Sequence, residues 1–410
     1  MLDRLTIGRM LAWAGAKPVL VALSGGGDSV ALLRLLAEQI GAGRLRAAIV
    51  DHGLREGSAA DASRALAFAT DIGVRAEVLR VSWPSAANRA QQAAREARYR
   101  ILCEHARALG ANGIATAHTA DDQAETVLMR AARGSTWRGL AGIAPFAFAP
   151  LWPEGRGIAL ARPLLNARRE DLRVYLRQRG ADWIEDPANV NPAFERVRVR
   201  RRLAELERGD FDPMRLTRIA ARLRAQAGRI DEAAANLIAS AASLGPTIRI
   251  ARSAWVAPLE VRQRALSALM AAASGASREP SWTDMEELEG CILSQGANGT
   301  AHGVHFASTS EGVTLRRDLG AVLGRADGAP PLAPLALTEN VEAIWDGRLA
   351  VTAPAPGWRI VPVRNGDLAG FEKDAVRQPQ AEARAQLRLR WLAAERVAHA
   401  FAPDVNRSKT

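Results

Sequence analysis

The stretch Ser24-Gly25-Gly26-Gly27-Asp28-Ser29 constrains the fold of this chain more than any other. It follows an apolar run at residues 18–23 and precedes an amphipathic run at residues 30–37, an order that predicts a strand, a glycine loop and a helix. Three glycines remove every Cβ from the turn, so backbone N–H groups can approach an anion closely. Ser24 and Ser29 add hydroxyl donors, and the helix directs its partial positive end to the same place. We therefore predict a phosphate-binding loop rather than a plain turn.

Asp28 distinguishes this loop from the other common phosphate loops. A Walker A loop ends in lysine followed by Ser or Thr, and Asp28 stands where that lysine would be. The GxGxxG spacing of dinucleotide-binding loops is also absent. A carboxylate beside phosphates indicates a bridging Mg²⁺, because two anions otherwise repel. The loop resembles the PP-loop of the N-type ATP pyrophosphatases, which cleave ATP between the α and β phosphates and adenylate a substrate oxygen.

Predicted strands and helices alternate through the first 205 residues. The strands are expected at residues 18–23, 45–50, 75–81 and 113–117. This alternation predicts an α/β fold, a Rossmann-like parallel sheet with helices on both faces. Ligands of such sheets bind at the carboxyl ends of the strands. Three polar clusters are expected there: the glycine loop, Asp51-His52 and residues 118–126.

The segment from His118 to Thr126 carries a second candidate group. It follows a predicted buried strand and opens a helix, so Asp122 and Glu125, three residues apart, share one helix face. Carboxylates are electrostatically tolerated at a helix N-terminus, and ordinary first-turn capping is the alternative role. In the same sheet as the glycine loop, they are predicted to hold a metal ion or an amino group.

The charge balance predicts a polyanionic partner. The formal net charge is +11, and all but three of the 55 Lys and Arg residues are arginines. A GC-rich genome would explain the Arg/Lys ratio but not the excess of base over acid. Arginine binds phosphate bidentately, so nucleic acid is the first candidate. Beyond the sheet, we expect a mainly helical domain at residues 206–320 and a small C-terminal α+β domain at residues 335–410.

Several protein classes are excluded. No apolar run reaches the roughly 18 residues that span a bilayer, and the N-terminus lacks a signal-peptide layout, so we expect a cytoplasmic protein without a membrane partner. Cys103 and Cys291 lie far apart and neither belongs to a CxxC pair, which argues against a zinc ribbon, an iron–sulfur site and a disulfide framework. The sequence leaves a monomer and a homodimer both open.

Seven short motifs, taken in order, give a more specific resemblance. They are the glycine loop and residues 50–55, 94–99, 117–126, 133–135, 162–165 and 185–189. As an ordered set they are similar to the tRNA(Ile)-lysidine synthase family over residues 18–205, and more weakly over residues 205–320. Two positions depart from the family pattern. Val197 stands where asparagine is common, and Thr136 stands where glycine is common, so we expect a shifted loop at Thr136.

The resemblance implies a two-step reaction. ATP would adenylate the C2 oxygen of the wobble cytidine in the CAU anticodon of tRNA(Ile), and the ε-amino group of free L-lysine would then attack C2 and displace AMP. Residues 1–205 would form the PP-loop catalytic domain, and the two domains at residues 206–320 and 335–410 would bind the tRNA. The loop at residues 24–29 would bind the pyrophosphate part of ATP, with Asp28 as a Mg²⁺ partner.

The resemblance also implies roles for the other candidate residues. Asp122 and Glu125 would hold the ammonium groups of the lysine and orient it for attack. His118 would assist proton transfer, with a hydrogen-bonded structural histidine as the alternative. Arg98, together with Arg95 on the same helix face, would neutralise charge that develops on phosphate, with a solvated helix face as the alternative.

Other functions stay open at this point. A thiolating tRNA enzyme of the same superfamily is the nearest rival, although its two-thiocytidine type uses paired cysteines that this chain lacks. An NAD or GMP synthetase would share the loop but would not need the arginine-rich downstream part. A non-catalytic RNA-binding protein would explain the charge but not a phosphate loop next to carboxylates.

Overall fold

The computed structural model describes the chain outside a small set of residues. Not described are residues 55, 84–90, 186–190, 281–284, 286–287, 291–293, 295, 326–329, 365–367, 402 and 404–410. The chain divides into two compact units, Met1–Gly228 with Ala402–Thr410, and Arg229–Phe401. The division falls inside the long helix α9, Met214–Ala241. Each unit has hydrophobic cores of its own.

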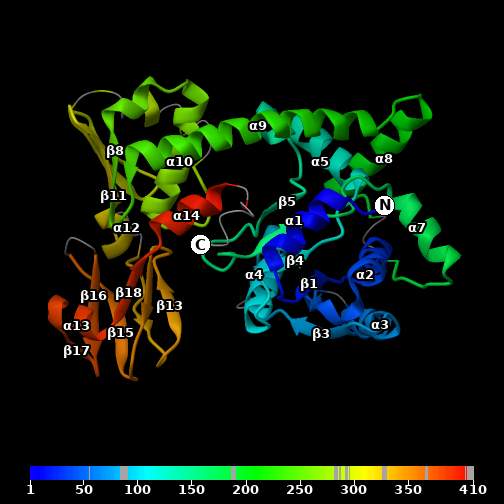
Figure 1. The fold of residues 1–410 in the computed structure, drawn as a ribbon, viewed down its shortest axis with the longest axis horizontal. Coiled ribbons are helices and arrows are strands. Elements are labelled where there is room, and N and C mark those ends of the chain that lie inside the picture. Colours follow the sequence, from blue (N-terminus) through cyan, green and yellow to red (C-terminus); the bar gives the residue numbers. More distant parts are fainter. Residues whose placement is uncertain are drawn as a thin grey trace. The chain divides into compact units, whose positions relative to one another are not determined.

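The first unit is built on a six-stranded sheet in the order β3-β2-β1-β4-β6-β5 (Figure 1). Its strands are β1 Val19–Ala22, β2 Leu45–Asp51, β3 Arg75–Arg80, β4 Gly113–Ala115, β5 Phe146–Phe148 and β6 Ala159–Ala161. All neighbours pair in parallel except β5, which pairs antiparallel with β6 at the edge. The predicted Rossmann-like fold is confirmed. The sequence did not predict the antiparallel edge strand, because a three-residue strand gives too short a pattern.

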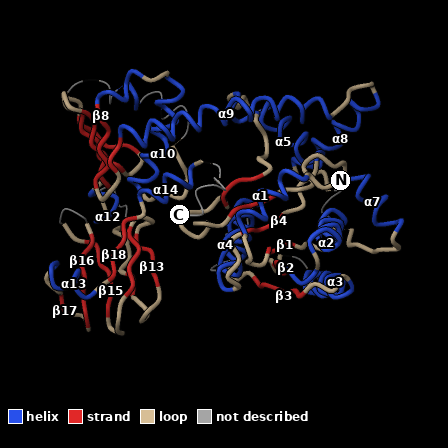
Figure 2. The backbone as a smooth tube through the Cα atoms, viewed as in Figure 1, coloured by secondary structure: helices blue, strands red, loops and turns tan. Residues whose placement is uncertain are grey.

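Helices cover both faces of this sheet (Figure 2). They are α1 Arg4–Ala14, α2 Gly27–Ile40, the 3₁₀ turn η1 Ala42–Arg44, α3 Ser58–Asp71, α4 Gln91–Ala108, α5 Ala120–Ala132, α6 Trp137–Leu140, α7 Arg169–Gln178 and α8 Glu195–Arg208. Val19 and Val21 of β1 belong to the core that includes residues of α1, α2, α3 and α7. Leu20 points the other way, into the core that includes α4. Burial on both faces explains why this strand is continuously apolar.

The strand order places a crevice beside β1. This strand has β2 on one side and β4 on the other, so the connections that leave β1 and β4 diverge at a topological switch point. In open α/β sheets the ligand binds at that point, outside the carboxyl ends of the strands. The glycine loop follows β1, and the segment from His118 to Thr126 follows β4. The fold therefore brings the two predicted site segments together.

The second unit begins with a sheet packed on a helix. The elements are β7 Ala242–Ser243, β8 Thr247–Ala251, η4 Arg252–Val256, α10 Leu259–Ser274, β9 Asn298–Ala301, β10 Val304–Ser308, β11 Gly312–Arg317 and α12 Leu319–Leu323. The strands form an antiparallel sheet in the order β7-β8-β11-β10-β9. Helices α9 and α10 confirm the helical pattern predicted for residues 206–320. Residues 296–317 resemble short strands and turns in the sequence, but their pairing with β8 into one sheet was not predicted. These strands have at most six residues, too few to show which distant strand they pair with.

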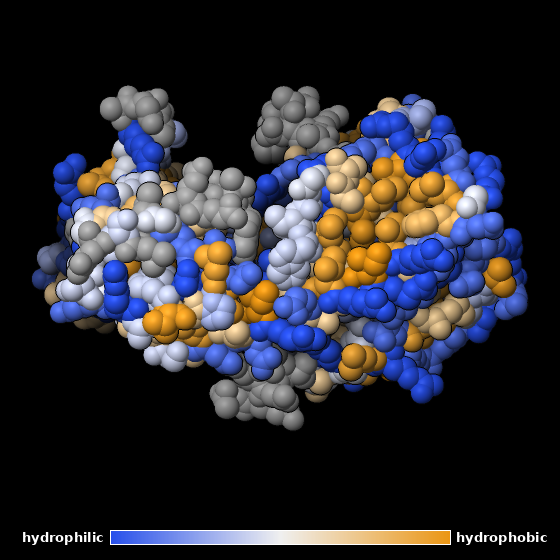
Figure 3. Space-filling view, turned by 90° about the horizontal axis from the view of Figure 1, so that it is seen from above, coloured by the Kyte–Doolittle hydropathy of each residue, from blue (hydrophilic) through white to orange (hydrophobic). Residues whose placement is uncertain are grey.

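The last part of the chain has the predicted α+β composition. Its elements are β12 Leu335–Ala336, β13 Glu342–Trp345, β14 Leu349–Thr352, β15 Trp358–Pro362, β16 Ala369–Lys373, β17 Val376–Arg377, α13 Gln380–Gln386, β18 Arg388–Trp391 and α14 Ala393–Ala400. Two small sheets, β12-β15-β16-β17 and β13-β14-β18, share a core that includes Trp358 and Phe371. No described helix is long and apolar enough to cross a membrane. On the face shown in Figure 3, hydrophobic side chains form one larger patch and several smaller ones among hydrophilic side chains.

Candidate active site

The glycine loop is shaped to leave backbone donors available. Gly25 has a φ of +83°, which glycine adopts without strain. A Cβ at this position would lie 2.5 Å from Ile184 Cδ1 and 3.1 Å from Ala65 Cβ. The Gly25 carbonyl accepts a 2.9 Å hydrogen bond from the Ile184 N–H, which fixes the loop against the segment after α7. Helix α2 has no side-chain cap, so no side chain covers the N–H groups at its start, where an anion can bind.

The two serines have different roles in this loop. Ser29 is 4% exposed, and its hydroxyl donates to the Gly26 carbonyl at 2.8 Å. The same Oγ accepts a 3.2 Å hydrogen bond from the Ser24 N–H and lies 3.1 Å from Ser24 Oγ. Ser29 therefore braces the loop from inside. Ser24 is exposed, so its hydroxyl is the one that can reach a ligand.

An arginine at the start of α7 joins the two predicted acidic positions. Arg169 Nε donates to Asp28 Oδ2 at 3.1 Å, and its Nη2 donates to Asp122 Oδ1 at 3.0 Å. Its Nη1 lies 3.5 Å from Glu125 Oε1. Burial alone would lower the pKa of Arg169, but Asp122, Asp28 and Glu125 together raise it above its usual value. One guanidinium thus contacts carboxylates from the glycine loop and from α5.

Glu125 is the most enclosed of these carboxylates, with a side chain that is 1% exposed. Its Oε1 accepts a 2.8 Å hydrogen bond from Arg200 Nε, and its Oε2 accepts a 2.9 Å hydrogen bond from Arg196 Nε. Both arginines belong to α8, so Glu125 attaches α8 to α5. An ammonium group at Glu125 would have to share these oxygens with the two arginines.

Asp122 caps its own helix and also faces the site. Its Oδ2 accepts hydrogen bonds from the Thr119 N–H at 2.8 Å and from the Thr119 hydroxyl at 3.0 Å. The Asp122 N–H donates to Thr119 Oγ1 at 3.3 Å, and this bond completes a capping box with the bond from the Thr119 N–H. Burial would raise the pKa of Asp122, but Arg169 and Arg196 lower it, so the carboxylate stays ionised. For Asp28 burial outweighs the effect of Arg169, and the pKa is raised. The two carboxylates on one guanidinium therefore have pKa values shifted in opposite directions.

Three arginines, Arg95 and Arg98 of α4 and Arg162 after β6, form a basic group around Tyr99. Tyr99 of α4 is 1% exposed, and its ring centroid lies 5.0 Å from Arg95 Cζ and 5.3 Å from Arg98 Cζ. Burial would raise the pKa of Tyr99, but Arg98, Arg95 and Arg162 lower it. Among the described residues, the Nε atoms of Arg98 and Arg162 are buried and have no hydrogen-bond partner. Such N–H groups can bind an anion that enters the site.

His118 lies near both the carboxylate Asp122 and the basic group around Tyr99. Its Nδ1 is 3.0 Å from Thr116 Oγ1. Burial, followed by the positive charge of Arg162, lowers the pKa of His118 to about 3, although Asp122 acts in the other direction. The imidazole is therefore neutral near pH 7. A general base works best when its pKa is near the working pH, so this imidazole is a weak base in the absence of substrate.

The site is not a preformed metal cage. No set of three or more His, Cys, Asp and Glu side chains in the described parts of the chain is arranged to hold a metal ion. Asp28 offers Oδ1, because Arg169 donates to Oδ2. Mg²⁺ is commonly bound by one or two carboxylates together with substrate phosphates. These residues therefore fit a Mg²⁺ ion that arrives with the triphosphate of a nucleotide.

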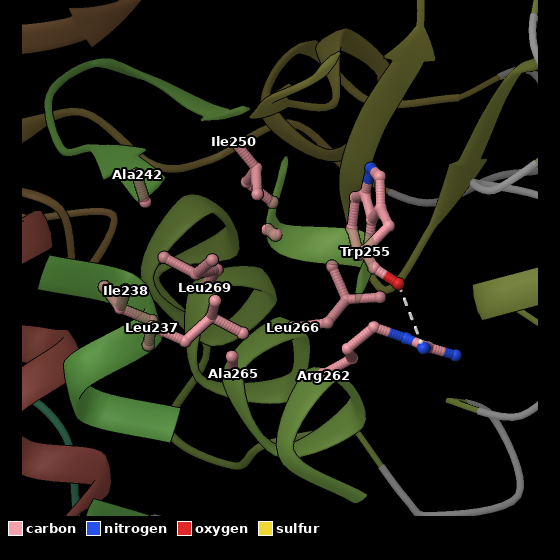
Figure 4. A pocket seen from close by; sticks show the side chains of 10 residues that line it. Leu237, Ile238, Ala242, Ile250, Trp255, Arg262, Ala265, Leu266 and Leu269 are labelled. Atoms are coloured by element: carbon pink, nitrogen blue, oxygen red, sulfur yellow. Dashed lines mark hydrogen bonds between the residues drawn. The ribbon is translucent and has the colours of Figure 1, made fainter. Parts of the chain in front are cut away.

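A cavity in the second unit has the wrong size and chemistry for a substrate. Its volume is about 10 Å³, and apolar side chains of α9, α10 and β8 form most of its wall (Figure 4). At its edge, Arg262 Nη1 donates to the Trp255 carbonyl at 3.1 Å. This volume admits at most one water molecule. The crevice of the first unit, where the segments after β1 and β4 meet, is the candidate active site.

Comparison with known proteins identifies the family. Residues 4–207 match a family model described as a PP-loop domain. A tRNA(Ile)-lysidine synthase from Hyphomonas neptunium is 51% identical over 189 residues, which cover 45% of this chain and 50% of that protein. A tRNA(Ile)-lysidine synthase from Mesorhizobium japonicum is 38% identical over 343 residues, which cover 81% of this chain and 71% of that protein. The chain belongs to the tRNA(Ile)-lysidine synthase family.

The known proteins that resemble this chain match it over different shares of their length. Among solved structures, the U34-tRNA thiolase NcsA from Methanococcus maripaludis with its 4Fe–4S cluster aligns with 54% of this chain and 78% of that chain, at 17% identity and a TM-score of 0.42. That likeness is too low to support a conclusion. The chain spans 50% of the length of the Hyphomonas protein and 71% of the Mesorhizobium protein. Family membership confirms the resemblance that the seven motifs indicated.

The structure brings the predicted site residues of this family member to one crevice. They are Ser24, Gly25, Gly26, Gly27, Asp28 and Ser29 of the loop, Asp122 and Glu125 of α5, His118 before α5, and Arg98 of α4. Their chemical roles stay predictions. At the loop where a shift was expected, Gly134 takes the positive φ of +67° and Thr136 has a φ of −58° as the N-cap of α6, so Thr136 needs no left-handed backbone there. Val197 is buried at the start of α8, and the predicted motif at residues 185–189 lies outside the described residues after Glu185.

The sequence did not predict the counter-charges of the site. These are Arg168, Arg169, Arg196 and Arg200. Arg168 Nε donates to Asp121 Oδ1 at 3.2 Å, and the Arg169 N–H donates to Asp121 Oδ2 at 2.7 Å. A signal was present, because acidic residues clustered at one strand end require cations from elsewhere in the chain. The number of downstream arginines concealed which of them have that role.

Proposed function

We propose that this chain ligates L-lysine to C2 of the wobble cytidine in the CAU anticodon of tRNA(Ile), with consumption of ATP. In the first step the C2 oxygen attacks the α-phosphorus of ATP, the bond between the α-phosphorus and the bridging oxygen breaks, and pyrophosphate leaves. In the second step the ε-amino nitrogen of lysine attacks C2, the C2–O bond breaks, and AMP leaves with that oxygen. The amine loses its protons, and the product is lysidine.

One observation supports this reaction above the alternatives. An anion-binding loop, an ionised carboxylate and a buried basic group meet at a single switch point. The reaction needs a place for a triphosphate, a place for an amine and a place for the charge that develops on the adenylate. An RNA-binding protein without catalysis needs only the basic surface.

The described residues can be given parts in this reaction. The loop N–H groups and the Ser24 hydroxyl would hold the pyrophosphate portion of ATP, and Asp28 Oδ1 would face a Mg²⁺ ion bound to it. When bound, that ion would supply charge neutralisation at the phosphates. Arg98, with Arg95, would bind the adenylate oxygens. Asp122 would hold an ammonium group of the lysine, and Glu125 would support it from the next turn of α5.

His118 is the proposed proton acceptor. In the tautomer whose Nδ1–H donates to Thr116 Oγ1, its Nε2 carries no proton and can accept one from the attacking amine. Its pKa of about 3 makes it a weak base before the substrates bind. The tRNA is too large for the crevice alone. We propose that residues 206–320 and 335–410 contribute to its binding, in line with the excess of positive charge in the chain.

The test is direct. The purified protein is incubated with ATP, radiolabelled lysine and tRNA(Ile) that carries a CAU anticodon, and label in the tRNA and AMP in solution are measured. The matched control is the same tRNA with its wobble cytidine replaced by guanosine, which lacks the C2 oxygen that is adenylated. We expect label only with ATP and the CAU anticodon. ATP-independent tRNA binding without AMP release would contradict the proposal.

A further inference from the structure

Arg169 stands out among the site residues because it contacts both halves of the site at once. Its Nε and Nη2 donate to Asp28 at 3.1 Å and to Asp122 at 3.0 Å, and these acceptors belong to the first turns of two different helices, α2 and α5. The Arg169 side chain is 18% exposed, so solvent does little to screen these contacts. The geometry is that of a fork whose separate N–H groups point to separate acceptors.

The helix that carries Arg169 is itself attached to neighbouring helices. The Arg169 N–H donates to Asp121 Oδ2 at 2.7 Å, which attaches the start of α7 to the start of α5. Farther along α7, the Tyr175 hydroxyl donates to Glu38 Oε1 at 2.8 Å, which attaches α7 to α2. The guanidinium therefore starts from a fixed main-chain position. It is not a surface side chain that has folded onto the site.

The remaining oxygens of the two carboxylates show what the fork leaves available. Asp122 Oδ2 is engaged by Thr119, and Asp122 Oδ1 accepts from Arg169. A carboxylate oxygen has two lone pairs, so Asp122 Oδ1 can accept from an amine as well as from Arg169. Asp28 Oδ1 faces away from the bond that holds Oδ2. Without the fork, neighbouring carboxylates would repel one another and turn apart.

We infer that Arg169 is a positioning residue for both steps of the proposed reaction. Its fork holds Asp28 at the glycine loop, where ATP is proposed to bind, and Asp122, which is proposed to hold the lysine ammonium group, in one fixed arrangement. Adenylation and lysine transfer therefore both depend on it. This inference rests on the proposed function. It assigns Arg169 no contact with substrate, because all three of its terminal nitrogens already face carboxylates.

The test compares R169Q and R169K with a control on the same helix. Arg173, four residues later, is more exposed and pairs with Glu185 at 3.3 Å, so R173Q removes the same charge outside the site. Pyrophosphate release with tRNA but without lysine measures the first step. Single-turnover transfer of lysine to pre-adenylated tRNA measures the second step. The melting temperature and the dissociation constant for ATP are measured for every variant.

We expect R169Q to slow both steps by roughly 100-fold, because a misplacement of about 1 Å has effects of that size. R173Q should stay within about twofold of the wild type in both steps, since rim charges contribute little. R169K keeps the charge and the attachment of α7 but not the fork, so it should recover less than about a tenth of each rate. If R169Q does not fold, R169K carries the comparison.

Two results would overturn the inference. One is a loss confined to a single step in R169Q, and the other is full recovery of both steps in R169K, which would show that one positive charge is enough. Failure of the proposed function gives a different result, namely no lysine incorporation by the wild type. ATP binding then decides: weaker binding by R169Q than by R173Q supports the role of the fork at Asp28, and equal binding refutes it.

Discussion

Replacement of Gly25 by alanine should disrupt the glycine loop at residues 24–29 without removing any functional group. Gly25 has a φ of +83°, and its Cβ would lie 2.5 Å from Ile184 Cδ1 and 3.1 Å from Ala65 Cβ. Ile184 could turn its terminal methyl aside. Ala65 is fully buried and has no side-chain freedom, so the backbone of the loop or of α3 would have to move.

The size of the effect follows from two contributions. A left-handed conformation costs a residue with a Cβ about 1–2 kcal/mol. Overpacking of a close-packed core costs about 1–3 kcal/mol. Their sum, about 2–5 kcal/mol, should lower the melting temperature of the first unit, which has about 240 residues, by about 4–20 °C. ATP binding should weaken as well, because the displaced loop no longer presents its N–H groups together.

Gly27 offers a matched control in the same loop. It starts α2 without a positive φ, and its Cβ would lie 3.4 Å from Trp183 Cδ1, an ordinary contact. G27A should therefore keep the wild-type stability within about 1 kcal/mol, since alanine favours a helix. Thermal unfolding followed by circular dichroism, with ATP binding by calorimetry, separates the two variants. A G25A protein as stable as G27A would refute the reasoning from the loop geometry.

Three further predictions concern the carboxylates and the histidine. Glu125→Gln leaves Arg196 and Arg200 without a charged acceptor. Because both arginines are partly exposed, we expect the free energy of unfolding to fall by about 1–3 kcal/mol, measured by urea unfolding. The exposed control Glu170→Gln should lose almost none. His118 has a pKa of about 3 in the folded chain and 6.5 when unfolded, so its contribution to the free energy of unfolding is complete above pH 6.5 and is lost as the pH falls toward 3. The free energy of unfolding should fall by about 2 kcal/mol between pH 6.5 and pH 5. A His118→Asn protein that loses as much stability over this range would contradict this prediction. Asp28→Asn should abolish pyrophosphate release and leave tRNA binding in a filter assay nearly unchanged, and an unaltered rate of release would exclude a metal role for Asp28.

The strands and helices of the first unit were predictable because their signals are local. The glycine loop, the apolar run before it and the amphipathic run after it lie within 20 residues, and the structure has β1 and α2 there. The sheet of the second unit was not predictable in this way. Its strands have alternating burial, as in β10, but over at most six residues, and pairing with strands far away in the chain decides whether such a segment extends.

The same distinction explains which site residues the sequence could supply. Asp122 and Glu125 are three residues apart, so helix geometry alone places them on one face. Arg169 is 47 residues from Asp122 and 141 residues from Asp28, and only the packing of α7 against α2 and α5 brings it between them. No local pattern contains that information. A sequence can therefore indicate that a carboxylate cluster needs cations without showing which arginines provide them.

This distinction also changes what the net charge of +11 can mean. Arg168, Arg169, Arg196 and Arg200 all have carboxylate partners at the site and neutralise acidic side chains of the same crevice. Those pairs cancel within the protein and leave no field for a nucleic acid. The attraction for a polyanion must therefore come from the other arginines, which include the basic group of Arg95, Arg98 and Arg162 in the crevice. For that reason, substitution of the four carboxylate-paired arginines should change the rates of the reaction while the salt dependence of tRNA binding stays the same.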